Sequence, residues 1–238
     1  MTRILTTKNL TVDDELNISE DELHYLLKVR RHKKGDQIEI QDSDGKIFLS
    51  IIKDINKKNA VALINDQTGT APPPLDVSII TAVPKGKILD NIIRNLSEIG
   101  VKRVIPVKCA RSAVDADKNK IERWRRISFE SMRQCVRKEP LIIEEELFFE
   151  EALSYDKRAA KIFMHPYSVD SAGDFLKLRH DVPVLSMTGP EGGFTNEEVA
   201  LAIDAGFTPL KFGNFILKIE TAILTAAVTC AISKGGFD

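Results

Sequence analysis

Two glycine-marked turns lie close together in the last quarter of the chain, each between a short apolar segment and a helix-like run. The first, Thr188–Gly193, has three glycines in its last five residues, so its backbone can approach a ligand closely and take positive φ values. The second, Phe212–Ile219, is followed by Glu220 and Thr221. A strand, a bare-backbone loop and a helix in this order can hold a ligand through amide and carbonyl groups. The pattern predicts one shared ligand pocket, and two ordinary strand-to-helix turns are the alternative.

The elements that must position these turns can be outlined from the same stretch. Residues 182–187 form an apolar run of strand length before the first turn, and residues 209–212 precede the second. Thr195 or Asn196 can cap the helix that follows the first turn. The run from 222 to 232 is small and apolar on nearly all sides, which indicates a buried helix, either in a core or at a subunit interface.

The first part of the chain is typical of β-structure. Residues 37–41 alternate polar and apolar side chains, and Asp44-Gly45 marks a hairpin turn before a returning strand over 46–55. Three prolines in the segment Gln67–Pro74 indicate an extended, semi-rigid linker. We therefore expect the first domain to end at residue 70.

The second part, residues 71–238, alternates strand-like and helix-like segments. Such alternation predicts an α/β domain with a parallel sheet. A long helix with one apolar side and many arginines is expected over residues 121–138.

The composition places the protein in a broad class. Of its 238 residues, 43% are hydrophobic and 29% charged, as in ordinary globular proteins. It shows neither a signal-peptide pattern nor an apolar run of membrane-spanning length, so we expect a cytoplasmic protein without membrane association. Three cysteines and four histidines lack metal-ligand spacing, which indicates a reducing compartment and no metal.

Charge is distributed unevenly, although the formal net charge is only -1. Residues 94–138 carry 13 Lys/Arg against 5 Asp/Glu, whereas residues 139–204 carry 5 against 14. Five of the seven residues in 28–34 are basic. Basic clusters attract phosphate groups, so these segments predict contact with nucleic acid, and solvated surface charge is the alternative.

Beyond these patterns, the motifs resemble a known family. Gly189–Thr195 with Glu198 reads G-P-E-G-G-F-T-x-x-E, and Phe212–Ala222 reads F-G-N-F-I-L-K-I-E-T-A, close to the pattern L-G-x-x-I-L-R-x-E-T-A. Together they resemble the C-terminal signature of SPOUT-class RNA methyltransferases, within them the family that methylates N3 of a uridine in 16S ribosomal RNA. Weaker matches, such as Lys85-Gly86 with Asp90, extend the resemblance over nearly the whole chain.

The resemblance implies a fold, a cofactor and partners. It implies a parallel-sheet SPOUT domain with a trefoil knot over residues 71–238, preceded by a small β-barrel PUA-like RNA-binding domain over residues 1–70. It further implies S-adenosyl-L-methionine as cofactor, 16S ribosomal RNA as substrate and a homodimer.

Particular residues take roles through the same resemblance. Arg111 and Arg137 match family arginines and are the candidate catalytic residues, since a cation stabilises the uracil anion left when the N3 proton departs; phosphate contact or plain surface charge is the alternative. The cofactor-binding candidates are Thr188, Gly189, Pro190, Glu191, Gly192, Gly193, Phe212, Gly213, Ile216, Leu217, Lys218, Ile219 and Thr221. The RNA-binding candidates are Arg3, Lys28, Arg30, Arg31, Lys33 and Lys34.

Some residues depart from the family pattern or keep two interpretations. Lys218 stands in place of an arginine and loses its bidentate fork, and Val136 stands where the family has glycine. Glu191 could contact a ligand or stabilise its loop, and Glu220 could cap the last helix. Two other functions stay open: a SPOUT enzyme that methylates ribose 2′-hydroxyls, and a non-catalytic RNA-binding homologue.

Overall fold

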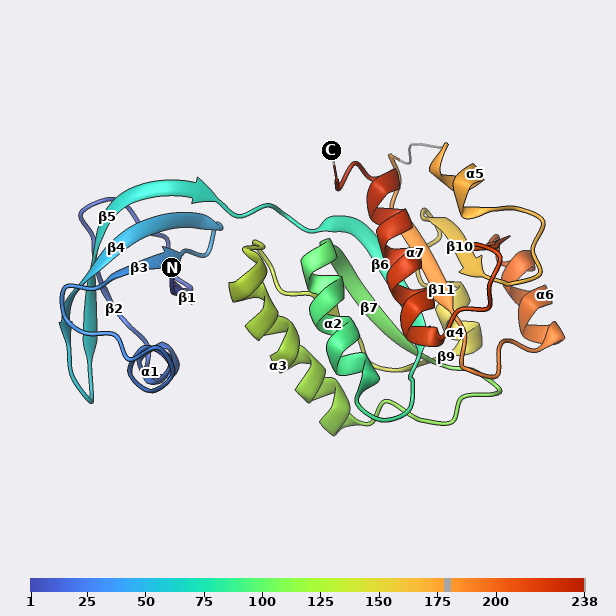
Figure 1. Cartoon of the computed structure of the whole chain (residues 1–238), viewed down its shortest axis with the longest axis horizontal. Helices are drawn as coiled ribbons and strands as arrows, with labels where there is room; N and C mark the ends of the chain where they lie inside the picture. The colour runs from blue at the N-terminus through green and yellow to red at the C-terminus, as the bar shows by residue number, and fades with distance from the viewer. Residues whose placement is uncertain (178–180, 238) are drawn as a thin grey trace. The chain divides into compact units, whose positions relative to one another are not determined.

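The structure is a computed structural model that describes residues 1–177 and 181–237 (Figure 1). The chain divides into two compact units: Met1–Pro73 with Arg133–Glu139, and Pro74–Met132 with Pro140–Asp238. The sequence predicted a single boundary after residue 70, which put residues 133–139 in the second domain. In the structure the Lys138 amide donates to the Pro72 carbonyl at 3.0 Å, and Gln41 Nε2 donates to the Arg137 carbonyl at 3.1 Å. These bonds tie the segment to the first unit.

The first unit is built on a five-stranded sheet in the order β1-β3-β4-β5-β2. Its strands and helical turns are β1 (Arg3–Leu5), β2 (Glu15–Asn17), α1 (Glu20–His24), η1 (Tyr25–Arg30), β3 (Gln37–Gln41), β4 (Lys46–Ile55) and β5 (Ala60–Thr70). The predicted strands over 37–41 and 46–55 are confirmed. β5 continues to Thr70, so the first half of the predicted linker is strand, paired with β4 up to Lys46.

The second unit contains a seven-stranded parallel sheet in the order β12-β10-β11-β6-β7-β8, with β9 paired to β7. Its elements are β6 (Leu75–Ala82), α2 (Ile88–Ile99), β7 (Val101–Lys108), α3 (Lys118–Cys135), β8 (Ile142–Ile143), β9 (Leu147–Phe148), α4 (Phe149–Leu153), β10 (Ala160–Met164), α5 (Ala172–Leu176), β11 (Val184–Thr188), α6 (Asn196–Asp204), β12 (Thr208–Leu210) and α7 (Ile219–Ser233). The predicted α/β fold is confirmed.

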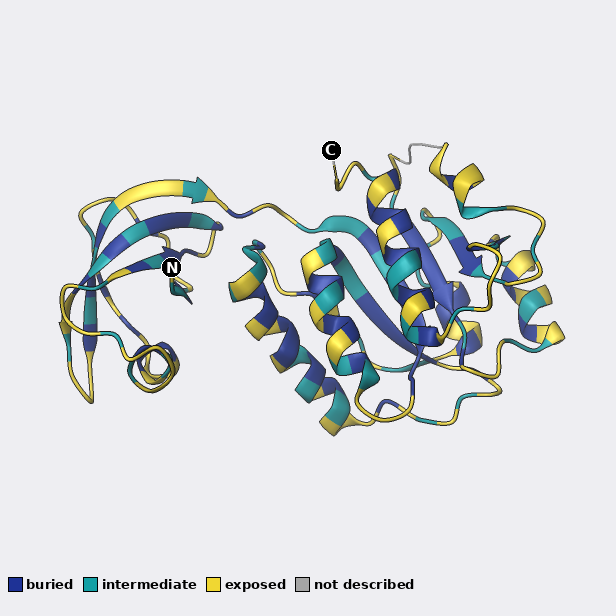
Figure 2. Cartoon of the chain, viewed as in Figure 1, coloured by how far each residue is buried: buried dark blue, intermediate teal, exposed yellow. Residues whose placement is uncertain are grey.

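The central strands of this sheet are apolar, so they are stable only where helices cover them. Every residue of β11 is buried, and β6 is buried over its last four residues (Figure 2). Helix α7 packs against β6, β11 and α2, and its small side chains let it approach closely. The expected buried helix over 222–232 is therefore largely confirmed, although Val228 and Ile232 stay 36% and 47% exposed.

Helix α3 ends earlier than the sequence predicted. The expected helix over 121–138 instead spans Lys118–Cys135, because Val136 has a φ of 62° in the left-handed region. That region costs an L-residue about 1–2 kcal/mol, and a β-branched side chain there is an outlier. This is the position where the resembled family has glycine.

We therefore expect Val136→Gly to raise the free energy of unfolding by about 1 kcal/mol. Glycine removes the left-handed strain, and its extra freedom in the unfolded chain offsets part of that gain. Val169→Gly is the matched control: Val169 is 99% exposed and has no positive φ, so the same exchange lowers stability slightly. Urea denaturation of the three proteins measures the difference. A Val136→Gly variant no more stable than the wild type would contradict the strain argument.

Candidate active site

The carboxyl ends of three neighbouring parallel strands open onto one cavity in the second unit. Strands β10, β11 and β12 end at Met164, Thr188 and Leu210, and the segments that follow each of them line the cavity. Its volume is about 790 Å³, within the range of small-molecule sites. Ligands of open α/β sheets bind at this end of the strands. The predicted shared pocket of the two glycine-marked turns is therefore present.

The structure brings nearly all of the predicted cofactor-binding residues together. The predicted residues that line the cavity are Thr188, Gly189, Pro190, Glu191, Gly192, Gly193, Phe212, Gly213, Ile216, Leu217, Lys218 and Ile219. Thr221 does not lie among the lining residues that the structure describes. It is the third residue of α7, and a helix rotates by about 100° per residue, so Thr221 is turned away from the side shared by Ile219, Glu220 and Ala222.

Other lining residues were missed from the sequence. The segment Met164–Tyr167 after β10 forms one wall, and Ile88 at the start of α2 also contributes. Only the sheet order places β10 between β11 and β12 and so brings this segment to the cavity. In this wall His165 and Tyr167 stack edge to face with ring centroids 6.0 Å apart, and Tyr167 is 80% exposed.

The first turn combines a tightly packed glycine with a buried hydroxyl. A side chain at Gly189 would have its Cβ 2.9 Å from the ring of Phe194, so only glycine fits there without a shift. Thr188 is buried, and its Oγ1 has no hydrogen-bond partner among the described residues. A buried polar atom without a partner is costly, so this hydroxyl is suited to a ligand with polar groups, such as the ribose or amino acid part of S-adenosylmethionine.

Arg111 reaches the same turn from the loop after β7, residues 109–117. Its Nη1 donates to the Gly192 carbonyl at 2.9 Å and to the Phe194 carbonyl at 3.4 Å. A tight turn, in which the Ser112 amide donates to the Cys109 carbonyl at 3.0 Å, presents the arginine. A guanidinium has five N–H groups, so two bonds leave others to meet negative charge at the cavity.

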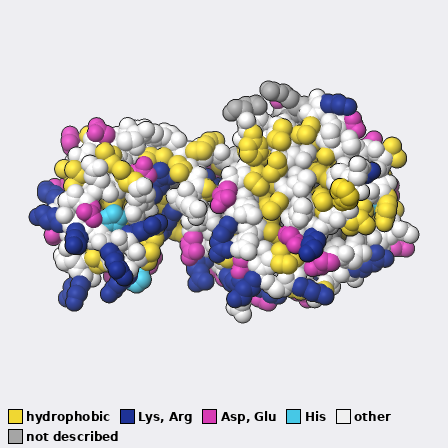
Figure 3. Space-filling view, in the orientation of Figure 1, with side chains coloured by type: hydrophobic (Ala, Val, Ile, Leu, Met, Phe, Trp, Pro, Cys, Tyr) yellow, Lys and Arg dark blue, Asp and Glu magenta, His cyan; other side chains and the backbone are white. Residues whose placement is uncertain are grey.

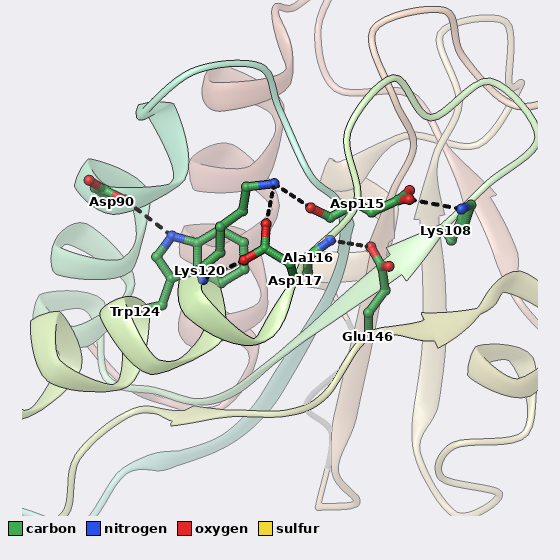
Figure 4. A network of polar contacts seen from close by, with 8 residues as sticks. All are labelled: Asp90, Lys108, Asp115, Ala116, Asp117, Lys120, Trp124 and Glu146. Carbon is green, nitrogen blue, oxygen red and sulfur yellow. Dashed lines mark hydrogen bonds and ion pairs between the residues drawn. The ribbon is translucent and has the colours of Figure 1, made fainter.

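The far end of that loop is held by a set of polar contacts (Figure 4). Lys108 Nζ pairs with Asp115 Oδ2 at 3.0 Å, and Lys120 Nζ donates to the Asp115 carbonyl at 2.6 Å. The Ala116 amide donates to Glu146 Oε1 at 2.8 Å. The loop is thereby tied to β7, to the first turn of α3 and to the segment before β9. Its two anchored ends restrict where Arg111 can lie.

Arg137, the other candidate catalytic arginine, lies in the first unit, outside the described lining of the cavity. It is 3% exposed, and burial lowers the pKa of its guanidinium. Val136, which precedes it, turns the chain out of α3 by its positive φ. Arg111 thus lines the cavity, and a catalytic role for Arg137 stays a prediction.

The basic cluster of residues 28–34 lies at η1 and directly after it. Lys28, Arg30, Arg31, Lys33 and Lys34 are all exposed. Lysine and arginine side chains gather over this unit in Figure 3.

Arg3 has different surroundings. Its Nη2 pairs with Glu39 Oε2 at 2.6 Å, and its side chain is only 9% exposed. The geometry therefore supports a structural ion pair between β1 and β3 rather than the predicted RNA contact.

Two glutamates with two interpretations can now be placed. Glu191 Oε1 accepts the Lys85 amide at 3.4 Å, which favours stabilisation of the loop, although Glu191 also lines the cavity. Glu220 lies in the first turn of α7 and lines the cavity as well.

Within residues 1–177 and 181–237, no cluster of three or more potential metal-binding side chains is found. Among the described helices, none has the length and hydrophobicity of a membrane span.

Comparisons with known proteins agree with this architecture. The family profile described as RNA methyltransferase domain matches residues 71–231, and the RNA methyltransferase PUA domain matches residues 18–65. Ribosomal RNA small subunit methyltransferase E of Synechocystis sp. is 30% identical over 92% of this chain and 74% of its own. The Bacillus subtilis protein of that name is 29% identical over 93% and 91%. The crystal structure of ribosomal RNA small subunit methyltransferase E from Neisseria gonorrhoeae bound to S-adenosyl methionine superposes with a TM-score of 0.83 at 27% identity, covering 95% of each chain.

Proposed function

The chain belongs to the RNA methyltransferase family, and we propose from this that it transfers a methyl group from S-adenosylmethionine to N3 of a uridine in 16S ribosomal RNA. One observation carries the proposal: both glycine-marked turns line a single cavity, and Arg111 lies against one of them. The PUA domain at residues 18–65 favours this substrate over ribose 2′-hydroxyls. The twelve predicted cofactor-binding residues that line the cavity favour an enzyme over a non-catalytic homologue.

The side chains and the backbone of the site fit the chemistry of such a transfer. S-adenosylmethionine supplies an electrophilic methyl group on a sulfonium. The glycine-rich backbone of the first turn and the Thr188 hydroxyl hold the polar parts of the cofactor. Arg111 stabilises, by a preorganised interaction, the negative charge that grows on the uracil oxygens as the N3 proton passes to a carboxylate or to water. Because N3 lies on the Watson–Crick edge, the target uridine is unpaired or flipped out.

The exposed basic cluster of the first unit supports a role in holding the RNA. Lys28, Arg30, Arg31, Lys33 and Lys34 provide five cations in one short segment, and each phosphate contact releases counterions. We keep these five as RNA-binding residues and leave out Arg3, because Glu39 neutralises it. Affinity for RNA should therefore fall steeply as the salt concentration rises.

A homodimer is part of the proposal. Apolar side chains of α7, among them Val228 and Ile232, remain exposed, and hydrophobic side chains gather over this helix in Figure 3. Such a patch on a helix is typical of a subunit interface. Light scattering at twice the chain mass of 26.6 kDa supports the dimer, and the monomer mass contradicts it. The trefoil knot, the catalytic role of Arg137 and the cytoplasmic location follow from the family resemblance and stay predictions.

The proposed function is tested in cells by comparing ribosomal RNA with and without this chain. Small-subunit RNA is purified from both strains, digested to nucleosides and analysed by mass spectrometry. Loss of one 3-methyluridine per small subunit on deletion, and its return on complementation, is the expected result. An unchanged content of 3-methyluridine would contradict the assigned substrate, while loss of a 2′-O-methylated nucleoside would support the alternative enzyme.

A further inference from the structure

Glu198 is a buried carboxylate that makes contacts on two different segments. It lies in the first turn of α6 and is 6% exposed. Its Oε2 accepts the Thr195 amide at 2.8 Å, while Thr195 Oγ1 accepts the Glu198 amide at 3.1 Å. This reciprocal pair is a capping box, which satisfies two free amides at the start of the helix. A glutamate used only as a helix cap needs one carboxylate oxygen for this purpose.

The second oxygen of Glu198 leaves its own helix. Oε1 accepts the Ala110 amide at 2.8 Å, across 88 residues of sequence. Ala110 directly precedes Arg111 in the loop after β7. Burial of the carboxylate strengthens both bonds, because a low local dielectric favours charge-assisted hydrogen bonds and leaves little competition from water.

Arg111 completes the connection in the opposite direction. Its Nη1 donates to the carbonyls of Gly192 and Phe194, which lie between the first glycine-marked turn and Thr195. A Cβ at Gly192 would meet the Arg111 side chain at 3.4 Å, so the two are in close contact. Residues 192–198 therefore bind the loop after β7 through Glu198, and that loop binds the same residues through Arg111.

We infer that Glu198 is a positioning residue for methyl transfer, which fixes the backbone beside Arg111 and thereby sets the place of the guanidinium at the cavity. The inference deepens the proposed function and rests on it for its kinetic part. Its structural part, the bond from Ala110 to Glu198, is independent of activity. Small misplacements of a catalytic group cost large factors in rate, so the kinetic effect is measurable.

The test compares three single variants with the wild type. Glu198→Gln keeps the volume but offers only one acceptor oxygen for two amides, so one bond is lost. Thr195→Ala removes the Thr195 half of the cap and leaves the Glu198 side chain intact. Asp204→Asn removes the same charge from an exposed residue of the same helix and is the matched control. If Glu198→Gln does not fold, Glu198→Asp retains the charge at the helix start but is one methylene too short to reach the loop.

The expected kinetic result is a split between these variants. Glu198→Gln lowers kcat about tenfold and changes the Kd for S-adenosylmethionine by less than about threefold. Thr195→Ala lowers the Tm by as much as Glu198→Gln does but keeps kcat within about twofold, and Asp204→Asn leaves kcat unchanged. Because Glu198 acts through Arg111, the double variant Glu198→Gln/Arg111→Ala is no slower than Arg111→Ala alone. Equal kcat losses in Glu198→Gln and Thr195→Ala, or multiplying losses in the double variant, would overturn the inference.

Amide hydrogen exchange decides the structural part without any transfer assay. In Glu198→Gln the Ala110 amide should exchange at least about tenfold faster, because its acceptor is weakened or lost. Its exchange in Thr195→Ala should match the wild type after correction for global stability. An Ala110 amide that exchanges equally in all variants would overturn the connection. If the wild type transfers no methyl group yet this exchange difference is present, the proposed function fails and the Glu198 connection stands.

Discussion

Replacing Arg111 with alanine is expected to lower kcat for methyl transfer by about 10²–10³-fold, the loss typical when one preorganised donor to a developing anion is removed. The Kd for S-adenosylmethionine should change by less than about tenfold, because the turns that line the cavity keep their backbone. Arg111→Lys should recover little of the lost kcat. A guanidinium can bond the Gly192 carbonyl and keep further N–H donors for the substrate, whereas an ammonium lacks this planar fork. Single-turnover kinetics with saturating cofactor measure the chemical step.

The matched control for this prediction is Arg158→Ala. The Arg158 side chain is 85% exposed in the second unit, and among the described residues its one ion pair is a long contact with Asp156 at 3.8 Å. Removing one positive charge there should leave kcat within about twofold, since exposed ion pairs contribute little. If Arg111→Ala and Arg158→Ala change kcat by the same factor, Arg111 contributes no more than general positive charge, and its proposed catalytic role is wrong.

The second large effect is expected at Gly189. Gly189→Ala would place a Cβ 2.9–3.1 Å from three atoms of the Phe194 ring, and that ring already packs against Phe149 and Phe163 with centroid distances of 5.8 and 5.9 Å. Such overpacking lowers the free energy of unfolding by about 1–3 kcal/mol, and the shift that relieves it moves the turn that lines the cavity. The Kd for S-adenosylmethionine should rise by about tenfold to a hundredfold.

Isothermal titration calorimetry of Gly189→Ala against wild type measures this change. Gly173→Ala is the control, because Gly173 lies in α5, outside the described cavity lining, and its added Cβ meets Ser171 Oγ only at an ordinary 3.5 Å. That variant should bind the cofactor with unchanged affinity and be slightly more stable. Unaltered affinity in Gly189→Ala would mean that the first turn does not contact the cofactor.

The local parts of the site could be predicted from the sequence, because they depend on short-range signals. The two turns after β11 and β12 are marked by glycines such as Gly189 and Gly213, and the cavity indeed joins them. The strands over 37–41 and 46–55 follow from alternation and a hairpin turn. The sequence offered Thr195 or Asn196 as the cap of α6, and in the structure Thr195 is the cap, with its hydroxyl accepting the Glu198 amide.

The parts that escaped prediction depend on long-range packing or on strain. The wall around His165 follows from the position of β10 between β11 and β12, which no local pattern encodes. The ion pair that neutralises Arg3 joins β1 to β3 across 36 residues. The end of α3 at Cys135 depends on a left-handed Val136, a conformation that a β-branched residue rarely takes. Arg137 is buried within the first unit, and no local pattern in the sequence indicates that burial.

Transfer of a labelled methyl group in a purified system tests the central claim most directly. The protein is incubated with S-adenosylmethionine carrying a trideuterated methyl group and with small-subunit RNA or subunits from cells lacking this chain. The RNA is then digested and analysed by mass spectrometry. The account predicts one trideuterated 3-methyluridine per RNA, formed about 10²–10³-fold more slowly by Arg111→Ala. Label on another atom or nucleoside, or RNA without label while the protein is folded and the cofactor saturating, would contradict it.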